Sequence, residues 1–129
     1  MSVNLPVSWG EVVDKVTILD IKLSRLTEST KRQNVQHERE VLDPWYRRAL
    51  AARPGVSDLA RALRDVNESL WDIEDAIRDC ERKKDFGPTF IDLARSVYRH
   101  NDRRAALKRE LNLLLDSDLV EEKSYTPYD

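Results

Sequence analysis

SDLARALRDVNESLWDIEDAIRDCE, residues 57–81, carries the strongest structural signal in the chain. Its apolar residues recur at intervals of alternately four and three positions, which is the spacing of one face of an α-helix and not of a strand. They are Leu59, Leu63, Val66, Leu70, Ile73, Ile77 and Cys80. The pattern predicts a long helix that buries this stripe against neighbouring helices.

Upstream of this helix, residues 8–26 have an unusually clear helix start. Ser8 and Glu11 form an S-x-x-E capping box, in which each side chain accepts a hydrogen bond from a backbone N–H at the exposed helix end. The apolar residues that follow again step by four and three, at Val12, Val16, Leu19, Leu23 and Leu26. This spacing predicts a helix with one buried stripe, interrupted at Thr27.

The segment between these two helices is less regular. Its apolar residues are Val35, Val41, Leu42, Trp45 and Leu50. Asp43 is a good helix N-cap and Pro44 suits a first helical position, so we expect this helix to be kinked, or to restart, at Asp43-Pro44. Arg53-Pro54-Gly55 should end it.

Downstream, residues 83–88 form a turn, and Pro88 suits the first turn of a helix that should run to about Asp116. Its apolar residues are Leu93, Val97, Leu107, Leu111 and Leu114. A turn of about five residues makes the helices on either side antiparallel neighbours. Residues from Leu119 to Asp129 should form a short tail along the bundle. The chain is therefore predicted to be a single all-α domain, residues 1–129, folded as an antiparallel bundle of about four helices.

The composition suits this fold. The chain has 129 residues, of which 40% are hydrophobic and 36% charged, with only three glycines and five prolines. This is long enough for one core and typical of helices joined by short loops. No apolar run approaches the roughly 18 residues that cross a bilayer, and the first residues lack the features of a signal peptide. The single cysteine, Cys80, cannot form an internal disulfide, so we expect a reducing cytoplasm.

Charge is divided unevenly along the chain. Residues 65–81 hold seven acids and one base, whereas residues 95–109 hold six bases and one acid. Antiparallel pairing of the two helices should set the acidic run beside the basic run. The arginines would then have an internal partner, which counts against a nucleic-acid surface.

A row of polar residues, which we call the polar seam, interrupts the apolar faces of the last two helices. Its members are Tyr98, Asn101, Lys108 and Asn112 on the fourth helix and Asn67, Trp71, Glu74 and Arg78 on the third. Half-buried polar groups are costly unless they satisfy one another or a ligand. Two interpretations stay open: a pocket for a polar or anionic small molecule, with Arg78 and Lys108 as charge donors, or an internal network that fixes helix register.

Other charged residues could also bind ligands. Lys15, Lys22 and Arg25 share one side of the first helix, where they could hold an anion or face solvent and pair with acids. A ladder of carboxylates on the third helix could hold magnesium. It consists of Glu68, Asp72, Asp75 and Asp79. The E-E-x-x-E pattern of all-α nucleotide pyrophosphohydrolases is absent, however, and Arg64 and Arg82 can neutralise the ends of the ladder.

The remaining chemistry-bearing residues indicate no site. His37 and His100 have no Cys or His at metal-ligand spacing. Cys80 continues an apolar stripe and is interpreted as a core residue. There is no glycine-rich phosphate loop and no G-x-S-x-G motif. We therefore expect no metal and no cofactor.

Four stretches together resemble a family of small bacterial domains of unknown function. They are SWGEVVDKVTILDIKLSRL (8–26), LWDIEDAIRDCE (70–81), LARSVYRHNDRRAALKRELN (93–112) and EEKSY (121–125). They cover about half of the chain. The resemblance implies a domain that occurs alone or with tetratricopeptide and glycosyltransferase-type proteins, in surface-polysaccharide gene settings. It implies no reaction.

The resemblance also marks particular residues. The family's recurrent polar positions correspond to Asp14, Lys15, Thr17 and Lys22, to Trp71, Glu74, Asp75 and Arg78, and to Asn101, Asp102, Arg103 and Lys108. At Asp20 the family more often has glutamate, which leaves the role of that position open. Several of the marked residues also belong to the polar seam.

Three functional hypotheses follow. The first is a non-enzymatic helical module in cell-surface carbohydrate synthesis, which binds a partner protein or an anionic ligand resembling a sugar nucleotide. Its candidate ligand-binding residues are Lys15, Lys22, Trp71, Glu74, Arg78, Tyr98, Asn101, Arg103 and Lys108. The second is a metal-dependent enzyme acting on a phosphorylated substrate through Glu74 and Asp75. The third is a structural homodimer, in which the apolar stripes continue across a subunit interface.

Overall fold

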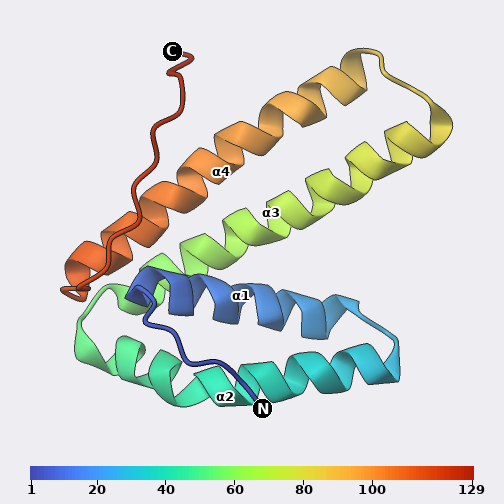
Figure 1. Cartoon of the computed structure of the whole chain (residues 1–129). Coiled ribbons are helices and arrows are strands. Elements are labelled where there is room, and N and C mark those ends of the chain that lie inside the picture. The colour runs from blue at the N-terminus through green and yellow to red at the C-terminus, as the bar shows by residue number, and fades with distance from the viewer.

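The structure, a computed structural model that describes all residues from Met1 to Asp129, consists of four α-helices and no strand. The helices are α1 (Trp9–Arg25), α2 (Ser29–Ala52), α3 (Val56–Lys83) and α4 (Pro88–Leu114). α1 and α2 form one hairpin, and α3 and α4 form a second, longer one (Figure 1). No helix combines the length and the apolar character that crossing a membrane requires. The all-α four-helix fold predicted from the sequence is confirmed.

The start of α1 matches half of the predicted capping box. The Ser8 hydroxyl accepts a hydrogen bond from the backbone N–H of Glu11 at 3.1 Å. The Glu11 carboxylate does not return to the backbone of Ser8, because it binds the ammonium group of Lys108 on α4 at 2.8 Å. The helix cap therefore already includes a tertiary contact.

α2 differs from the prediction around Pro44. The helix continues without interruption from Ser29 to Ala52, with Pro44 in its interior, so it does not restart there. Asp43 is not an N-cap: its carboxylate pairs with Arg39 at 2.8 Å and with Arg47 at 2.7 Å, one turn away on each side. These i,i+4 pairs support the turns on either side of the proline. The kink stays a prediction.

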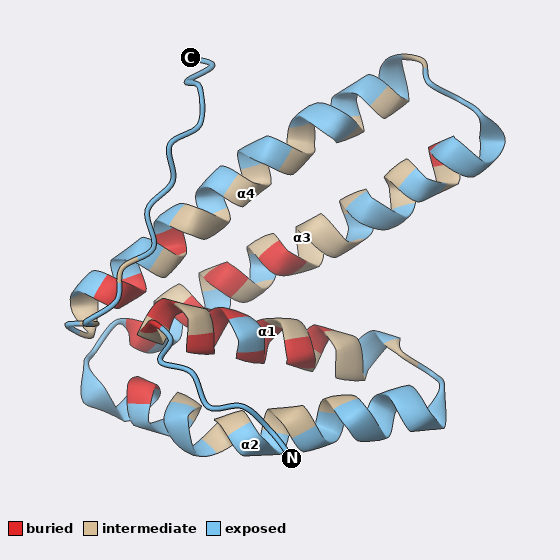
Figure 2. Cartoon of the chain, in the orientation of Figure 1, coloured by how far each residue is buried: buried red, intermediate tan, exposed pale blue.

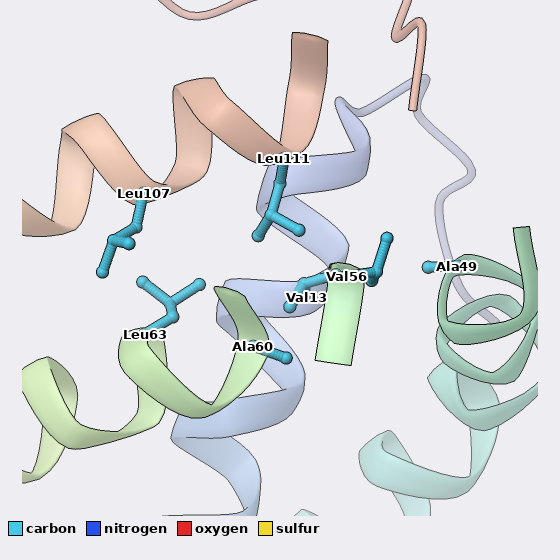
Figure 3. Packing of buried hydrophobic residues seen from close by; sticks show 7 residues of the cluster. All are labelled: Val13, Ala49, Val56, Ala60, Leu63, Leu107 and Leu111. Carbon is cyan, nitrogen blue, oxygen red and sulfur yellow. The ribbon is translucent and has the colours of Figure 1, made fainter. Parts of the chain in front are cut away.

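The hydrophobic core lies where all four helices meet. Its buried cluster consists of Val13, Ala49, Val56, Ala60, Leu63, Leu107 and Leu111 (Figure 3). α1 and α3 each pack against the other three helices, and α1 is the more deeply buried of the two. Accordingly, α1 is buried on more than the predicted stripe: Val13, Asp14, Thr17 and Ile21 are buried in addition to Val12, Val16 and Leu19.

The α3–α4 hairpin extends well beyond α1 (Figure 1). Its base, residues 56–67 and 104–114, contains the core residues of both helices. Its arm, residues 70–100, contains one buried residue, Cys80, at 9% exposure, as predicted for a core position. Figure 2 shows this difference, with buried residues confined almost entirely to α1 and the base.

The C-terminal tail contacts α4, as the sequence predicts. Glu121 and Glu122 pair with Lys108 and Arg109. Further along, the ring of Tyr128 lies edge-on to that of Tyr98, with centroids 5.0 Å apart. The tail therefore follows α4 from its last turns back towards the arm.

Candidate functional site

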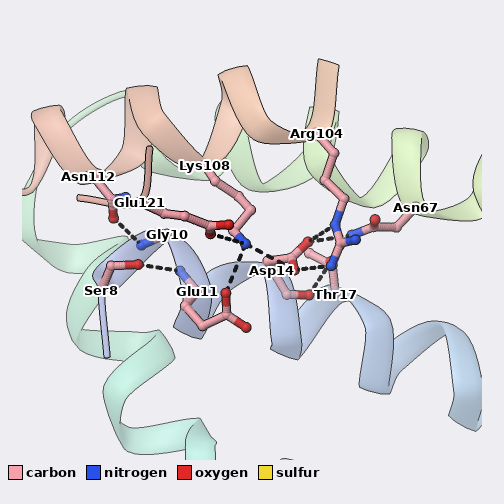
Figure 4. Close-up of polar contacts among 10 residues, drawn as sticks. All are labelled: Ser8, Gly10, Glu11, Asp14, Thr17, Asn67, Arg104, Lys108, Asn112 and Glu121. Carbon is pink, nitrogen blue, oxygen red and sulfur yellow. Dashed lines mark hydrogen bonds and ion pairs between the residues drawn. The ribbon is translucent and has the colours of Figure 1, made fainter. Parts of the chain in front are cut away.

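The centre of the candidate site is the carboxylate of Asp14 on α1, a residue only 1% exposed. Its Oδ1 accepts hydrogen bonds from Asn67 Nδ2 on α3 and from Arg104 Nε on α4, each at 2.9 Å (Figure 4). Its Oδ2 accepts a further bond from Arg104 Nη2 at 2.5 Å. Thr17, one turn along α1, accepts from Asn67 Nδ2 at 2.8 Å and donates to the Asp14 carbonyl at 2.7 Å. One buried carboxylate therefore joins three helices.

Arg104 compensates the charge of Asp14. Its planar guanidinium makes two parallel hydrogen bonds to the two carboxylate oxygens, the strongest geometry for such a pair. These bonds raise the pKa of Arg104 and outweigh burial, which acts in the opposite direction. A carboxylate buried without such a partner would be strongly destabilising. The burial of the Asp14 carboxylate in its charged form therefore depends on its ion pair with Arg104.

Lys108 lies one turn along α4 and forms the second part of the network. Its side chain is 12% exposed, and its Nζ donates to Glu11 at 2.8 Å and to Glu121 of the tail at 3.1 Å. Asp14 Oδ2 is 4.0 Å away. Burial opposes the charged form of Lys108, but the two hydrogen bonds and the charge of Asp14 outweigh it and raise the pKa. Three carboxylates thus surround one ammonium group.

The network continues to the N-terminus of α1 through Gly10. Its N–H donates to Asn112 Oδ1 on α4 at 2.6 Å, in a fully buried contact. A Cβ at this position would lie 2.5 Å from the carbonyl oxygen of Lys108 and 2.9 Å from Asn112 Oδ1. Only glycine lets the two backbones approach so closely. The predicted seam residue Asn112 is therefore a structural acceptor for the first turn of α1.

The network is closed on itself. No buried side-chain nitrogen or oxygen in the chain lacks a hydrogen-bond partner. Two cations, Arg104 and Lys108, face three carboxylates, those of Glu11, Asp14 and Glu121. Positive charge here is already compensated, so the arrangement is suited to fixing the packing of α1, α3 and α4 and poorly suited to holding an anion.

The α3 half of the polar seam is split between two environments. Asn67 belongs to the network around Asp14. Glu74 and Arg78 lie in the arm and pair with each other at 3.3 Å, both largely exposed. Trp71 is half-buried, with the guanidinium of Arg25 from α1 5.9 Å from its ring centroid. These four predicted residues do not converge on one pocket.

The α4 half of the seam is divided in the same way. Lys108 is in the network, and Asn101 is half-buried between the network and the arm. Arg103 is exposed and forms no ion pair. Tyr98 is 40% exposed and packs against the tail, and a hydrogen bond from Arg95 lowers its pKa.

The basic residues of α1 also lie apart from the network. Lys15 is exposed and lies 3.8 Å from Glu38 of α2. Arg25 pairs with Asp72 of α3 at 2.5 Å, near the end of α1. Lys22 is half-buried and forms no ion pair. The first helix therefore presents dispersed, mostly paired cations and no common anion site.

Some network residues were missed by the helical pattern alone. Asp14 and Thr17 were marked only by the family resemblance, and Arg104 and Glu121 were not singled out as site residues. A signal was present for Asp14: it lies between Val12, Val13 and Val16, so a helix buried on two faces must bury it. Nothing local indicates Glu121, because its partner lies across the tail turn.

The expected pairing of the acidic run of α3 with the basic run of α4 is wrong. No ion pair joins the two helices. The acids of α3 pair within α3 or with Arg25, and the bases of α4 that form pairs bind α1 and the tail. The reason is that the facing stripes of the hairpin are apolar, so the charges point outwards. The argument from internal pairing against a nucleic-acid surface therefore no longer applies.

Three of the four carboxylates in the ladder of α3 pair with cations of the chain itself, and Asp75 forms no ion pair. Glu68 pairs with Arg64, Asp72 with Arg25, and Asp79 with both Arg82 and Lys83. No three His, Cys, Asp or Glu side chains are gathered as a metal site needs. The neutralising role expected for Arg64 and Arg82 thus matches the geometry.

A separate feature is an apolar groove on the opposite side of α1. It measures about 850 Å³ and lies between the N-terminal segment, α1 and α2. Its apolar lining includes Leu5, Val7, Trp9, Val41, Leu42 and Trp45. The rings of Trp9 and Trp45 lie 6.2 Å apart, and Trp45 is 49% exposed. Of these residues, the sequence pattern marked only Val41, Leu42 and Trp45, as apolar positions of α2, and it did not indicate a groove.

Comparisons with other proteins do not test the resemblance to the family of small bacterial domains. The chain matches no model of a known protein family, no curated protein and no solved structure.

Proposed function

We propose that this chain is a non-enzymatic helical module that binds an amphipathic segment of a partner protein in the groove beside Trp9 and Trp45. The observation that carries this proposal is the groove itself. Two-thirds of its twelve lining residues are hydrophobic, and Val41 and Trp45 are 58% and 49% exposed. Exposed tryptophans in an apolar groove are typical of the centre of a protein–protein interface.

A protein segment fits this groove better than a small molecule does. Small-molecule sites place several polar groups so that they converge on the ligand. Here the polar lining residues are Asn4, Glu11 and Lys15, and the last two already bind Lys108 and Glu38. An apolar face of a helix needs no such polar groups, because it gains its affinity from buried apolar area.

The cellular setting of the proposal rests on the resemblance alone. It points to a bacterial protein in cell-surface carbohydrate synthesis, and the lone, buried Cys80 suits a reducing cytoplasm. The resemblance also allows an anionic ligand such as a sugar nucleotide. The compensated charge around Lys108 favours the partner protein over that ligand.

Site-specific photocrosslinking in the native host tests the proposal. A photoreactive residue at Val41 should form an adduct with another polypeptide. The matched control is the same residue at Leu113, which is 60% exposed and lies outside the groove. Trp45→Glu should abolish the adduct at position 41. It should not unfold the chain, because about half of the surface of Trp45 is exposed to solvent.

Two results would overturn the proposal: no polypeptide adduct at position 41, or an equal adduct at position 113. A thermal-shift titration with nucleotide sugars separates the anionic alternative, since a ligand that binds only the folded state must raise the melting temperature. A rise that Arg103→Ala or Lys108→Ala removes would favour the sugar nucleotide instead.

A further inference from the structure

The first turn of α1 forms one wall of the apolar groove, because it carries Trp9. The Trp9 ring lies 6.2 Å from that of Trp45, and Glu11 and Val12 of the same turn also line the groove. The position of this turn therefore sets the shape of the groove. The first N–H groups of a helix have no partner within the helix, so other groups must bind them if the turn is to be held.

The four N–H groups at the start of α1 are bound from two directions. Ser8, directly before the helix, accepts from Glu11 through its hydroxyl at 3.1 Å and from Val12 through its carbonyl at 3.2 Å (Figure 4). The first two N–H groups bind the other end of the chain instead. Trp9 N–H donates to Ser117 Oγ at 3.2 Å, and the next N–H donates to the last turns of α4, as described above. Half of the N-terminal cap of α1 is thus supplied by residues more than 100 positions away.

Ser117 is placed by the C-terminal end of α4. Its N–H donates to the Asn112 carbonyl at 2.8 Å, and the N–H of Asp116 donates to the Leu113 carbonyl at 3.4 Å. Asp116 has a φ of 51°, in the left-handed region. Together these features form a Schellman motif, in which the chain reverses direction after a helix. The Ser117 hydroxyl donates to the Leu119 carbonyl at 2.7 Å, and its oxygen therefore has a fixed orientation towards α1.

We propose that Ser117 is a positioning residue of the groove: by accepting a hydrogen bond from Trp9 N–H, it holds the Trp9 ring beside Trp45 in the orientation that a partner contacts. This inference rests on the proposed function of the groove. Ser117 does not line the groove, so it acts on a partner only through Trp9. It is half-buried and outside the hydrophobic cluster, so removing its hydroxyl opens no cavity in the core.

Ser117→Ala in the purified full chain tests the positioning of Trp9 without a partner. The Trp9 amide should exchange its hydrogen at least about fivefold faster, which is the effect of losing one capping hydrogen bond. The nuclear Overhauser contact between the rings of Trp9 and Trp45 should weaken. Ser117→Thr keeps the hydroxyl and should restore both values. Leu93→Ala, which destabilises the arm instead, should leave both at their wild-type values.

The same variants test the effect on partner binding through the photoreactive residue at Val41. Ser117→Ala should lower the yield of the polypeptide adduct at least about twofold, because the first turn of α1 is then less often in place. Ser117→Thr and Leu93→Ala should both retain the wild-type yield. Thermal unfolding should show that Leu93→Ala lowers the melting temperature at least as much as Ser117→Ala does, which separates the groove from overall stability.

Two results would overturn the proposal. One is an unchanged Trp9 amide and an unchanged ring contact in Ser117→Ala. The other is an equal loss of adduct in Ser117→Ala and Leu93→Ala, which would show that only overall stability matters. The measurements on the purified chain decide the positioning of Trp9 even where wild type forms no adduct, a result that would overturn the proposed function alone.

Discussion

The base and the arm of the α3–α4 hairpin have the same apolar spacing but different burial. In the base, Leu63 and Leu111 are fully buried against α1 and α2. In the arm, Ile73 and Leu93 occupy equivalent steps of the pattern and are only half-buried. Helical periodicity therefore identifies the apolar face of a helix. It does not show how much of that face is buried by the rest of the chain.

The two regions also differ in the burial of their ion pairs. In the base, Asp14 and Arg104 are held in one geometry by two helices and by Asn67. In the arm, Glu74 and Arg78 form an exposed pair within one helix. A buried pair is strongly destabilising when one member is removed, whereas an exposed i,i+4 pair contributes little. The following experiments test this contrast, from the largest expected effect to the smallest.

Arg104→Ala should lower the free energy of unfolding by about 3–5 kcal/mol, because it leaves the Asp14 carboxylate buried without a cation. Chemical denaturation followed by circular dichroism measures this loss. The matched control is the neighbouring Arg103→Ala, which removes an exposed, unpaired arginine and should change stability by less than about 0.5 kcal/mol. Similar losses in both variants would mean that the network does not stabilise the base.

Leu63→Ala and Leu93→Ala remove the same atoms from the base and from the arm. Leu63 is fully buried, so its loss should cost about 2–5 kcal/mol through lost burial and the remaining cavity. Leu93 is half-buried, and its loss should cost about half as much or less. Equal costs would show that the arm is packed as tightly as the base.

Gly10→Ala should destabilise the chain by about 1–3 kcal/mol, because the new Cβ would clash with the Lys108 carbonyl and strain the contact with Asn112. Gly87→Ala, at the start of α4 in the arm, meets only the Asp85 side chain at 3.3 Å and should change stability by less than about 0.5 kcal/mol. Thermal and chemical unfolding of both variants check the difference. A tolerated alanine at position 10 would show that α1 can move away from α4.

Lys108 should make the base sensitive to alkaline pH. Its pKa in the folded state is raised above the ordinary value of 10.5, so its stabilising contribution is complete below pH 10.5 and is lost as the pH rises through the higher folded value. Wild type should therefore lose more stability above about pH 10.5 than Lys108→Gln does, with a difference of at most about 1 kcal/mol.

The arm provides the control for this measurement. A hydrogen bond to Asp79 raises the pKa of Lys83, but this lysine is exposed. Lys83→Gln should therefore follow the wild-type pH profile, because solvent screens the pair. Indistinguishable profiles for Lys108→Gln and wild type would show that the triad around Lys108 adds no net stability.

Much of this fold was predictable because its determinants are local. The start of α1 at Ser8, the stripe of α3 and the first turn of α4 at Pro88 each follow from a few neighbouring residues. Pro44 was misleading, because Arg39 and Arg47 hold the carboxylate of Asp43 that was expected to cap a new helix.

The site was less predictable, because the bonds that join its helices span 50 to 102 positions of the sequence. Helical phase correctly marked Asn67, Lys108 and Asn112 as polar groups on inward faces. It could not identify Asp14 as their common partner, since that depends on α1 being buried on two sides at once. Helical phase also could not show that the polar seam is buried beside α1 and exposed beyond its end. That boundary is set by the length of α1 relative to α3.

The span between Asp14 and Arg104 has a consequence for the order of events during synthesis. Ninety residues separate the carboxylate from its guanidinium, so a growing chain exposes α1 long before α4 leaves the ribosome. α1 and α2 can pair early, but the face of α1 that holds Asp14 must stay hydrated until α4 arrives. Stable packing of α1 therefore requires nearly all of α4 to have been synthesised. A chain stalled before residue 104 would hold α1, α2 and α3 but only the first part of α4, a partly folded form that chaperones and proteases recognise.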